Sequence, residues 1–320
     1  MALVVTTIRA INRKNRSLSL NLADRLGYCV SQSNLAFVPK CEPVKSEEVE
    51  LLKQFLRDCG KICVVTGAGI STESGIPDYR SEGVGLYATS NRRPMSYQDF
   101  CKSEKNRKRY WARNYAAWPS FSLFQPNYTH KWLKSMEDIG KVNCVITQNV
   151  DYLHRKAGSK NVIELHGTGY NVKCMRCERQ VDRFEFQKIL DELNPSLKVT
   201  STEIRPDGDV ELTQEQADGF VVPPCSSCGG ILKPNIVFFG DNVARNVVEQ
   251  VKNEVEDADS LLVLGTSLTT FSGYRIILQA TEAVKPIAIV NIGDTRGDSH
   301  AQLKIRGRCG EILESIGNKL

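Results

Sequence analysis

The chain has 320 residues, of which 41% are hydrophobic and 25% are charged, and its formal net charge is +5. This composition argues against a disordered chain, and no apolar run approaches the length of roughly eighteen residues that a membrane-spanning helix needs. Eleven cysteines in a chain of this length do not indicate the disulfide scaffold of a small secreted protein. The length favours one α/β domain that carries a smaller inserted module.

The N-terminal segment is rich in Arg, Ser and Leu and contains no acidic residue before Asp24. This composition is typical of a mitochondrial transit peptide, and the segment lacks the apolar block of a secretory signal. We therefore predict a transit peptide over residues 1–27, a flexible segment over residues 28–45 and a location in the mitochondrial matrix. An ordinary disordered tail is the alternative.

The folded part is predicted to begin at Ser46, where Ser46, Glu47 and Glu48 precede apolar residues at helical spacing. We expect a capped amphipathic helix that ends near Gly60. Four short runs rich in Val, Ile and Leu follow, and each has the length of a buried parallel strand. These runs are residues 62–65, 142–146, 261–264 and 287–290.

Small or polar residues follow each of these four predicted strands directly. The four strand tips are residues 66–69, 147–149, 265–267 and 291–293. In a doubly wound sheet the carboxyl ends of the parallel strands meet at one edge, where ligands bind. The pattern predicts an α/β fold with a Rossmann-like doubly wound parallel sheet, and one site formed by the four tips.

Four of the cysteines form two pairs with a two-residue gap, Cys174 with Cys177 and Cys225 with Cys228. The gap lets two sulfurs of one turn reach the same ion, and two such pairs complete the tetrahedral shell that zinc prefers. We predict one structural zinc ion, because a shell of four thiolates has no open position for catalysis. A redox pair or a chance arrangement is the alternative.

The zinc cysteines define a smaller zinc-binding module, predicted over about residues 169–232. The nucleotide-binding part then comprises about residues 46–168 and 233–320. Inside the module, residues 195–218 are acidic and show little periodicity, so we expect a long acidic loop. Residues 83–124 are expected to form short helices over the site.

Gly67, Ala68 and Gly69 follow the first predicted strand, where glycines let backbone amides approach a pyrophosphate. The dinucleotide fingerprint requires a third glycine where this chain has Thr72. The tripeptide alone is therefore equally consistent with a plain tight turn.

Three longer segments are more specific than the tripeptide. They read GAGISTESGIPDYR from Gly67, QNVDYLH from Gln148 and LHG from Leu165. Together with the order of the zinc cysteines, these segments closely resemble the sirtuin family, and the resemblance extends over about residues 49–310. It implies that NAD is a consumed co-substrate.

The resemblance implies a role for each part of the predicted site. His166 would act as the general base on a ribose hydroxyl of NAD, although a lone histidine is more often structural. Asn149 would hold the nicotinamide ribose and a water, and Asp151 would bind the nicotinamide carboxamide. The other residues expected at the cofactor are Gly67, Ala68, Gly69, Ile70, Ser71, Thr72, Pro77, Asp78, Tyr79, Arg80, Tyr87, Gln148, Val150, Gly265, Thr266, Ser267, Asn291, Ile292, Gly293 and Cys309.

Tyr79 and Cys309 are two of these cofactor residues for which the sequence leaves a question open. Tyr79 stands where family members usually have Phe, and its hydroxyl could alter how the flap over the ribose excludes water. Cys309 would meet the adenine through its backbone, and a buried small residue is the alternative.

An extended edge is expected in the cleft, where an acyl-lysine peptide would add as a strand. Its residues are Val237, Phe238, Phe239 and Gly240. A packed core strand is the alternative for the first two. Tyr110 and Arg113 resemble the pair with which a desuccinylating sirtuin holds an acyl carboxylate, and arginine suits such binding. Packing on a helix surface is the alternative for this pair.

The implied reaction is NAD-dependent deacylation of protein lysine. The acyl oxygen attacks C1′ of the nicotinamide ribose, nicotinamide leaves, and water later releases free lysine and O-acyl-ADP-ribose. The expected substrates carry lipoyl, biotinyl, glutaryl or hydroxymethylglutaryl groups on mitochondrial metabolic enzymes. Mono-ADP-ribosylation of proteins is the first alternative, and an NAD-sensing binding protein is the second. No nucleic acid is expected as a partner because the zinc module is acidic, and no membrane is expected.

Overall fold

The computed structural model describes residues 35–90, 93–197, 206, 210, 212 and 214–317. The predicted transit peptide, residues 28–34 and much of the predicted acidic loop lie outside the described residues. In the described part, no helix is both long enough and apolar enough to span a bilayer.

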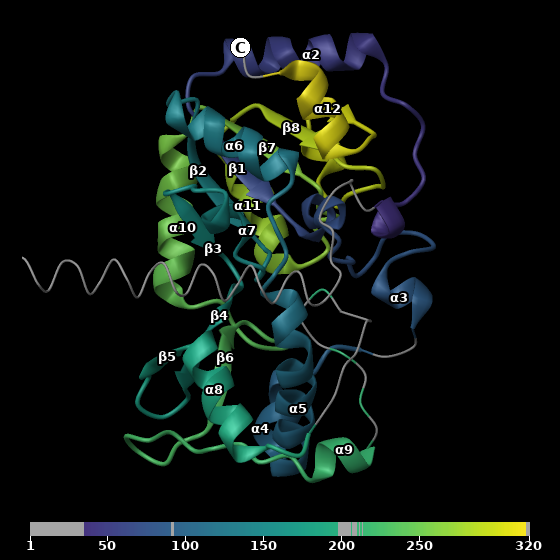
Figure 1. Ribbon diagram of the computed structural model, residues 1–320. Coiled ribbons are helices and arrows are strands. Elements are labelled where there is room, and N and C mark those ends of the chain that lie inside the picture. Colours follow the sequence, from purple (N-terminus) through teal and green to yellow (C-terminus); the bar gives the residue numbers. More distant parts are fainter. Residues whose placement is uncertain are drawn as a thin grey trace, which may run out of the picture. The chain divides into compact units, whose positions relative to one another are not determined.

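Six strands form one sheet in the order β3-β2-β1-β7-β8-β9, and every neighbouring pair is parallel (Figure 1). The strands are β1 (Ile62–Thr66), β2 (Val142–Thr147), β3 (Val162–Glu164), β7 (Ser260–Leu264), β8 (Ile287–Val290) and β9 (Leu303–Ile305). All four strands predicted from the sequence are confirmed. The sequence pattern misses β3 and β9 because each is a three-residue edge strand with partly exposed positions.

The chain builds this sheet outward from its centre in two directions. One half runs from β1 to β2 and β3, and the other half runs from β7 to β8 and β9. The strand order therefore reverses between β1 and β7, which opens a crevice at the carboxyl ends of these two strands. The predicted doubly wound fold is confirmed.

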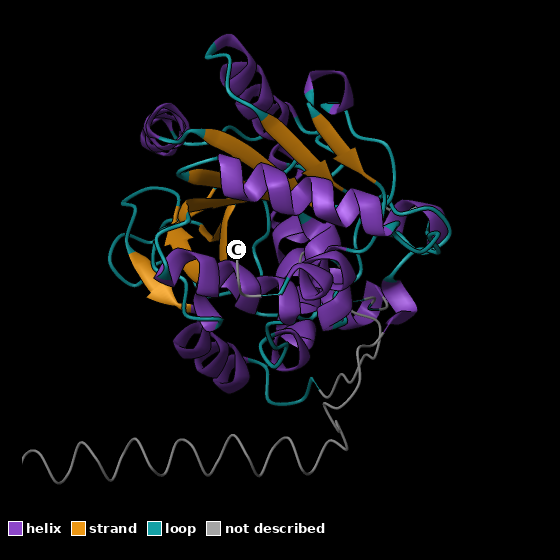
Figure 2. Ribbon diagram, turned by 90° about the horizontal axis from the view of Figure 1, so that it is seen from above, coloured by secondary structure: helices purple, strands orange, loops and turns teal. Residues whose placement is uncertain are grey.

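Helices cover both faces of the parallel sheet (Figure 2). One face carries α2 (Ser46–Asp58), α6 (Tyr128–Asp138) and α12 (Cys309–Ile316), and the other carries α10 (Arg245–Asp257) and α11 (Phe271–Glu282). Ile62 and Val64 of β1 belong to the first hydrophobic cluster, and Cys63 and Val65 belong to the second. Successive strand residues point to opposite faces, so burial of both faces explains the continuous apolar runs.

The first predicted helix is confirmed as α2, which begins at Ser46 and ends at Asp58. Glu48 Oε2 accepts a hydrogen bond from Lys45 N at 3.2 Å, so the chain enters the helix at Lys45. Leu52 and Leu56 are fully buried on its inner face. The helix fastens the start of the folded part to the sheet.

The smaller module contains a second sheet of three antiparallel strands in the order β5-β4-β6. Its strands are β4 (Gly167–Cys174), β5 (Gln180–Asp182) and β6 (Leu232–Ile236), and its helices are α4 (Tyr97–Lys102), α5 (Glu104–Phe121), α8 (Arg183–Leu193) and α9 (Gln214–Asp218). One hydrophobic cluster joins these elements and includes Phe100, Trp111, Phe186 and Phe220.

This module extends beyond the predicted range of residues 169–232. Residues 97–121, which the sequence analysis places in the nucleotide-binding part as short helices, form α4 and the 18-residue helix α5. Trp111 of α5 is fully buried, and its Nε1 donates to the carbonyl of Leu232 at 3.0 Å. Hydrophobic spacing identifies an apolar helix face but does not tell which sheet that face covers.

The described part of the predicted acidic loop is not all loop. It includes α9, Ala217 is buried in the hydrophobic cluster of the small module, and Val210 is also buried. These apolar residues stand among acidic ones in the sequence, which hides their packing role. They attach the end of this segment to α5.

Candidate functional site

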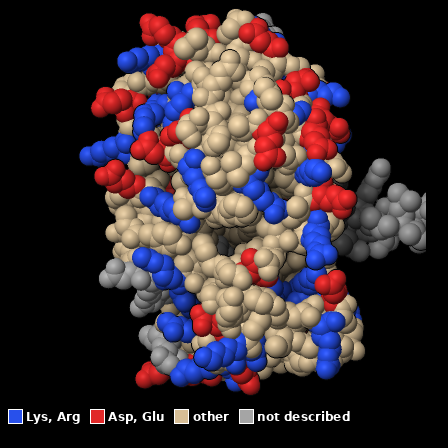
Figure 3. All heavy atoms as spheres, turned by 180° about the vertical axis from the view of Figure 1, so that it is seen from behind, with Lys and Arg blue, Asp and Glu red and all other residues tan. Residues whose placement is uncertain are grey.

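A cavity of about 1730 Å³ lies at the carboxyl ends of β1, β2, β7 and β8. Residues such as Tyr110 and Phe238, which belong to the hydrophobic cluster of the small module, complete its wall. In the space-filling view a hollow is visible between the upper and lower parts of the molecule (Figure 3). The cavity is thus formed by both sheets and their helices.

Most of the residues expected at the site line this cavity. They are Gly67, Ala68, Gly69, Ser71, Thr72, Pro77, Asp78, Tyr79, Arg80, Gln148, Asn149, Val150, Asp151, His166, Gly265, Thr266, Ser267, Asn291, Ile292, Gly293, Cys309, Tyr110, Val237, Phe238, Phe239 and Gly240. Among the described residues, Ile70, Tyr87 and Arg113 are expected at the site but do not line it. The structure therefore brings the four predicted strand tips together.

The glycines of the first strand tip are required by close packing against the third. A Cβ at Gly69 would lie 2.8 Å from the carbonyl oxygen of Gly265, and a Cβ at Gly265 would lie 2.6 Å from the nitrogen of Ile70. Gly265 also has φ +57°, which favours glycine. The segment that follows is the 3₁₀ helix η2 (Ala68–Ser74). Its residue Ile70 is buried in the hydrophobic cluster on one face of the parallel sheet. The two strand tips can therefore pack this closely only because neither position carries a side chain.

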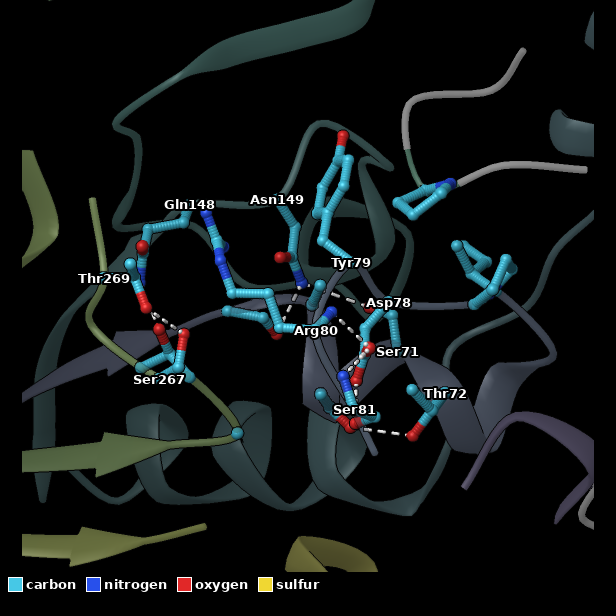
Figure 4. A pocket seen from close by; sticks show the side chains of 18 of the residues that line it. Ser71, Thr72, Asp78, Tyr79, Arg80, Ser81, Gln148, Asn149, Ser267 and Thr269 are labelled. Atoms are coloured by element: carbon cyan, nitrogen blue, oxygen red, sulfur yellow. Dashed lines mark hydrogen bonds between the residues drawn. The ribbon is translucent and has the colours of Figure 1, made fainter. Parts of the chain in front are cut away.

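A buried hydrogen-bond chain orients the polar groups of the second strand tip (Figure 4). Asn149 Nδ2 donates to the carbonyl of Gly67 at 3.0 Å and to Ser71 Oγ at 3.1 Å. Ser71 Oγ donates to Asp151 Oδ2 at 2.7 Å. Because the amide hydrogens of Asn149 are engaged, its amide oxygen is the group that it offers to a ligand. Burial raises the pKa of Asp151, while its bonds from Leu153 N and Ser71 act in the opposite direction.

Gln148 ties the second strand tip to the third. Its Nε2 donates to Thr266 Oγ1 at 2.9 Å, and its Oε1 accepts from Thr270 Oγ1 at 3.1 Å. Its side chain is thus held by the protein itself, with one side at the cavity. Ser267 Oγ lies 2.8 Å from Thr269 Oγ1, so the third tip is also internally bonded (Figure 4).

His166 is placed at the start of β4, between the two sheets. Its Nδ1 lies 3.0 Å from the carbonyl of Gln148, which can only accept, so Nδ1 carries the hydrogen. Nε2 then has the lone pair and lies 2.8 Å from Ser272 Oγ. Burial lowers the pKa of His166, so the ring is neutral at pH 7 and Nε2 is a base facing the cavity. The sequence pattern misses Ser272.

The other three histidines do not line the cavity. His300 bonds to Tyr274 at the surface of α11, and His130 and His154 are fully buried with their ring centroids 4.9 Å apart. Burial lowers the pKa of His154 to about 3 and also lowers the pKa of His130. These two rings are therefore neutral, and they support the first strand tip from behind through Thr66.

Asn127 continues this support on the other side of the first strand tip. Its Nδ2 donates to the carbonyl of Ile70 at 2.6 Å and to Ser74 Oγ at 3.0 Å, while its Oδ1 lies 3.0 Å from His130 Nδ1. η2 is thus held at its middle and at its end. Nothing in the spacing of Asn127 or His130 in the sequence indicates this role.

A turn at residues 78–81 forms the flap above the first strand tip. Asp78 Oδ1 accepts from the backbone nitrogens of Arg80 at 3.0 Å and Ser81 at 2.8 Å. The Tyr79 ring lies against Phe239, with a centroid separation of 5.9 Å, and against Tyr87 at 5.8 Å. Tyr87 therefore backs the flap instead of lining the cavity.

The residues predicted as a peptide edge lie beside α4. Tyr97 N donates to the carbonyl of Phe239 at 2.9 Å, and Val237 N donates to the carbonyl of His166 at 2.8 Å. Phe238 is buried in the small module, as the alternative interpretation expects, whereas Phe239 is 39% exposed. Part of this edge is therefore already paired, and Phe239 is the ring that it presents to the cavity.

The two residues expected to hold an acyl carboxylate are not brought together. Tyr110 is 3% exposed and packs on Phe238, with ring centroids 5.1 Å apart, at the cavity wall. Arg113 is also buried, and its Nε donates to the carbonyl of Val210 at 2.8 Å. This guanidinium therefore binds the segment before α9. Arg113 lies about one helical turn after Tyr110 on α5, and only Tyr110 lines the cavity.

Cys309 and the fourth strand tip lie at the opposite end of the cavity. The Cys309 thiol is buried under β8, where Sγ lies 3.7 Å from the carbonyl of Val290. Asn291 Nδ2 donates to the carbonyl of Gly293 at 2.9 Å. Residues 35–41 also contribute to this end, a contribution that the sequence analysis misses because it treats that segment as flexible.

The four zinc cysteines form a separate cluster in the small module. Their sulfur atoms all lie within 4.8 Å of one another, with Cys174 and Cys228 at 3.5 Å and Cys177 and Cys225 at 3.7 Å. Four sulfurs at about 2.3 Å from a tetrahedral zinc ion are about 3.8 Å apart, so the cluster fits one structural zinc ion. None of the four lines the cavity.

Comparison with known proteins identifies the family of the chain. The Sir2 family profile matches residues 67–272, which include both glycine-rich tips, His166 and the zinc cysteines. The chain belongs to the Sir2 family. The family resemblance predicted from the sequence is confirmed.

Relatives within the Sir2 family match almost the whole chain. The Drosophila melanogaster protein named NAD-dependent protein deacylase Sirt4 is 53% identical over 286 residues, which cover 89% of this chain and 92% of that protein. The Homo sapiens protein named NAD-dependent protein lipoamidase sirtuin-4, mitochondrial, is 50% identical over 288 residues, which cover 90% and 92% respectively.

A solved Sir2 structure in complex with a p53 peptide and NAD+ shares the fold. It is 28% identical to this chain, has a TM-score of 0.65, and covers 83% of this chain and 95% of its own. Sir2 proteins thus use NAD, and the cavity described above has the lining and the size to receive it.

Proposed function

We propose that this protein is an NAD-dependent protein-lysine deacylase. The observation that carries the proposal is His166: it is neutral, has a defined tautomer, and presents Nε2 at the meeting point of the two sheets. The names of its Sir2 relatives as NAD-dependent deacylases support the same activity. A base of this kind contributes about 10² to 10⁴ in rate.

The cofactor end of the cavity suits NAD as a consumed co-substrate. When bound, NAD supplies a ribose carbon that becomes reactive as nicotinamide leaves. The glycine tips and Ser267 would lie along its phosphates, and Asn291 and Cys309 would lie at its adenosine. Asn149 would orient the nicotinamide ribose through its amide oxygen, and Asp151 would hold the carboxamide.

His166 would take a proton from a ribose hydroxyl at Nε2. Ser272 Oγ donates to that nitrogen in the free protein, so its hydroxyl must turn aside as the substrate arrives. The positive charge that then forms on the ring is stabilised by the carbonyl of Gln148, which faces Nδ1–H at 3.0 Å. The flap and Phe239 would exclude water from this step.

The zinc ion would act only through folding. A shell of four thiolates is closed, so the metal has no position for a water or a substrate. Gly230 packs against the cluster, where an added Cβ would lie 2.9 Å from Cys174 Sγ. The ion would hold β4 and the segment before β6 together, and β4 carries His166 at its start.

The substrate would be an acyl-lysine on a protein, laid along residues 237–240 with its acyl chain directed at Tyr110 and Phe239. This aromatic wall favours long or branched acyl groups, and we propose lipoyl, biotinyl, glutaryl and hydroxymethylglutaryl groups as candidates. Mitochondrial metabolic enzymes are the proposed targets, because the human relative is named a mitochondrial lipoamidase. Import would require the predicted transit peptide over residues 1–27, with the catalytic domain beginning at Ser46.

A panel of peptides tests the proposal. Each peptide carries one acyl-lysine, and both nicotinamide release and loss of the acyl group are followed in the presence of NAD. Loss of acyl from at least one peptide is the expected result. A protein target that instead gains the mass of ADP-ribose would assign the chain to ADP-ribosyl transfer, and no nicotinamide release from any target would leave only NAD sensing.

A further inference from the structure

Arg275 is a cation in the wall of the cavity, and one of its donor atoms has no partner in the part of the chain that the structure describes. It lies on α11, and its Nη2 atom is buried and has no hydrogen-bond partner among the described residues. A guanidinium has five N–H donors, and a buried donor without an acceptor is unfavourable. A ligand acceptor at this part of the wall would remove that cost once the Arg275 side chain turns Nη2 toward the cavity.

A second groove of about 570 Å³ continues from this point onto α10. Asn242, Val243 and Arg275 line both the groove and the main cavity. The groove is also lined by Arg245, Val248, Glu249 and Lys252. Three cations and one carboxylate thus line the groove, and Lys252 Nζ also lies 3.6 Å from Glu256 Oε1 on the same helix. Figure 3 shows Lys and Arg side chains on both sides of the hollow.

The carboxylate next to this groove in the sequence does not cancel its charge. Asp241 lies 3.6 Å from Lys233 and is occupied by that ion pair. Arg245 and Lys252 are exposed on α10. The groove therefore offers a positive surface to a ligand that reaches out of the main cavity.

Arg275 lies on the same helix as Ser272, which contacts His166. It follows Ser272 by three residues on α11, so the two side chains share a face and are about 5 to 6 Å apart at their Cβ atoms. Ser272 Oγ in turn lies 2.8 Å from His166 Nε2. Asn242 and Val243 follow Gly240, the end of the proposed peptide edge, after the intervening Asp241.

We propose that Arg275, with Arg245 and Lys252, selects protein substrates that carry an Asp or Glu within two residues of the acyl-lysine. This inference rests on the proposed function. A peptide with its acyl-lysine at His166 would place its next residues at about 3.3 Å intervals, which brings a flanking carboxylate within reach of Arg275. Arginine suits a carboxylate because its donors form a fork.

The flanking side chain is favoured over the acyl group as the source of this carboxylate. The acyl chain is directed toward Tyr110 and Phe239, which come from α5 and the segment before Gly240. The groove is built from α10, α11 and the segment after Gly240. A carboxylate on the acyl group would therefore point toward α5, whereas a carboxylate on a flanking side chain would point toward α10 and α11.

The test uses peptides with one acyl group and one variable residue. Glu, Gln or Lys is placed in turn at each of the two positions on either side of the acyl-lysine, and kcat/KM is measured for the full-length protein and its variants. The expected result is a preference for Glu over Gln of about tenfold at one or more positions, which corresponds to one charge-assisted hydrogen bond. The preference should shrink at high salt because the groove is partly exposed.

The variants are Arg275→Gln, Arg275→Glu and the double change of Arg245→Gln with Lys252→Gln. The Glu preference should fall below about twofold in Arg275→Gln, and Arg275→Glu should prefer Lys. The double variant should show a smaller loss, since its cations are exposed. Lys131→Gln, an exposed change on α6, is the matched control and should keep the wild-type preference. The ratio within each variant is the readout, so a general loss of turnover does not affect it.

Equal turnover of Glu and Gln peptides by the wild-type protein would overturn the proposal, as would an unchanged preference in Arg275→Gln. A variant that loses only its preference for glutaryl-lysine would assign Arg275 to the acyl group and would also overturn it. Fluorescence anisotropy with labelled peptides compares Glu and Gln peptides by binding affinity instead of by turnover. A wild-type protein that binds Glu peptides selectively but removes no acyl group would contradict the proposed function and leave this inference standing.

Discussion

The two ends of the cavity are built in different ways. The cofactor end consists of four strand tips of one parallel sheet, and its polar side chains are bonded mainly to one another, as in the chain from Asn149 through Ser71 to Asp151. The substrate end is assembled from α5, the segment after β6 and α11, and it presents aromatic rings and a cation, Arg275, whose Nη2 has no partner among the described residues. The polar side chains of the cofactor end are therefore oriented before a ligand binds, whereas the substrate end presents groups that a ligand would contact.

This difference indicates where selectivity resides. A preorganised polar site costs little to order on binding and suits one invariant ligand. A wall made of rings from distant segments can change with little effect on the parallel sheet. If the two ends are separable, a change at one end should leave the other end intact.

Removal of zinc should have the largest effect. Structural zinc sites contribute on the order of 10 kcal/mol or more to folding, so Cys228→Ser or a strong chelator should unfold the small module. Fluorescence of Trp111 and Trp118 should shift to the red as activity disappears, because both rings are buried in or beside that module. Cys101→Ser, a half-buried cysteine of α4, is the matched control. Loss of zinc and activity with an unchanged spectrum would contradict a purely structural metal.

His166→Ala should abolish catalysis while sparing the fold. The expected loss in kcat is about 10² to 10⁴, and the melting temperature should change little because His166 lies at a cavity wall. His300→Ala, which alters a histidine remote from the cavity, should keep normal turnover. A kcat for His166→Ala within threefold of the wild-type value would show that His166 is not the general base.

Gly265→Ala should damage the cofactor end specifically. The new Cβ would lie 2.6 Å from Ile70 N at a residue with φ +57°, so we expect a loss of about 1 to 3 kcal/mol in stability and at least a tenfold rise in KM for NAD. Gly219→Ala is the control, because Gly219 does not line the cavity and no atom lies within 4 Å of its added Cβ. Similar NAD kinetics for the two variants would mean that the close approach of the strand tips is unimportant.

The buried histidines behind the cofactor end should make stability depend on pH. The folded-state pKa of His154 is about 3, and its unfolded value is about 6.5, so below pH 6.5 the unfolded chain binds a proton that the folded chain does not. Its contribution is therefore complete above pH 6.5 and decreases as the pH falls. At pH 5 the loss is roughly 2 kcal/mol.

Urea unfolding at pH 7 and pH 5 measures this contribution. The decrease in wild-type stability should exceed that of His154→Gln by roughly 2 kcal/mol. Glu164, whose pKa burial raises to about 7, acts in the opposite direction, but it is common to both proteins. Equal decreases in the two proteins would show that His154 is protonated in the folded state.

The cofactor end could be predicted from the sequence, and the substrate end could not. β1, β2, β7 and β8 are buried on both faces, so their apolar runs and their polar tips are visible in the sequence, and parallel topology then places the tips together. Tyr110 and Arg113 share a helix turn, yet only Tyr110 reaches the cavity, because the burial of Trp111 sets the rotation of α5. Ser272 and Arg275 have no distinguishing spacing in the sequence, and only the fold places Ser272 beside His166 and Arg275 in the cavity wall.

The most direct test of the account is the stoichiometry of the reaction. With an acyl-lysine peptide and NAD, we predict one nicotinamide released for each lysine deacylated, with both products absent from His166→Ala. Nicotinamide release without loss of the acyl group, or deacylation that proceeds without NAD, would contradict the proposed function.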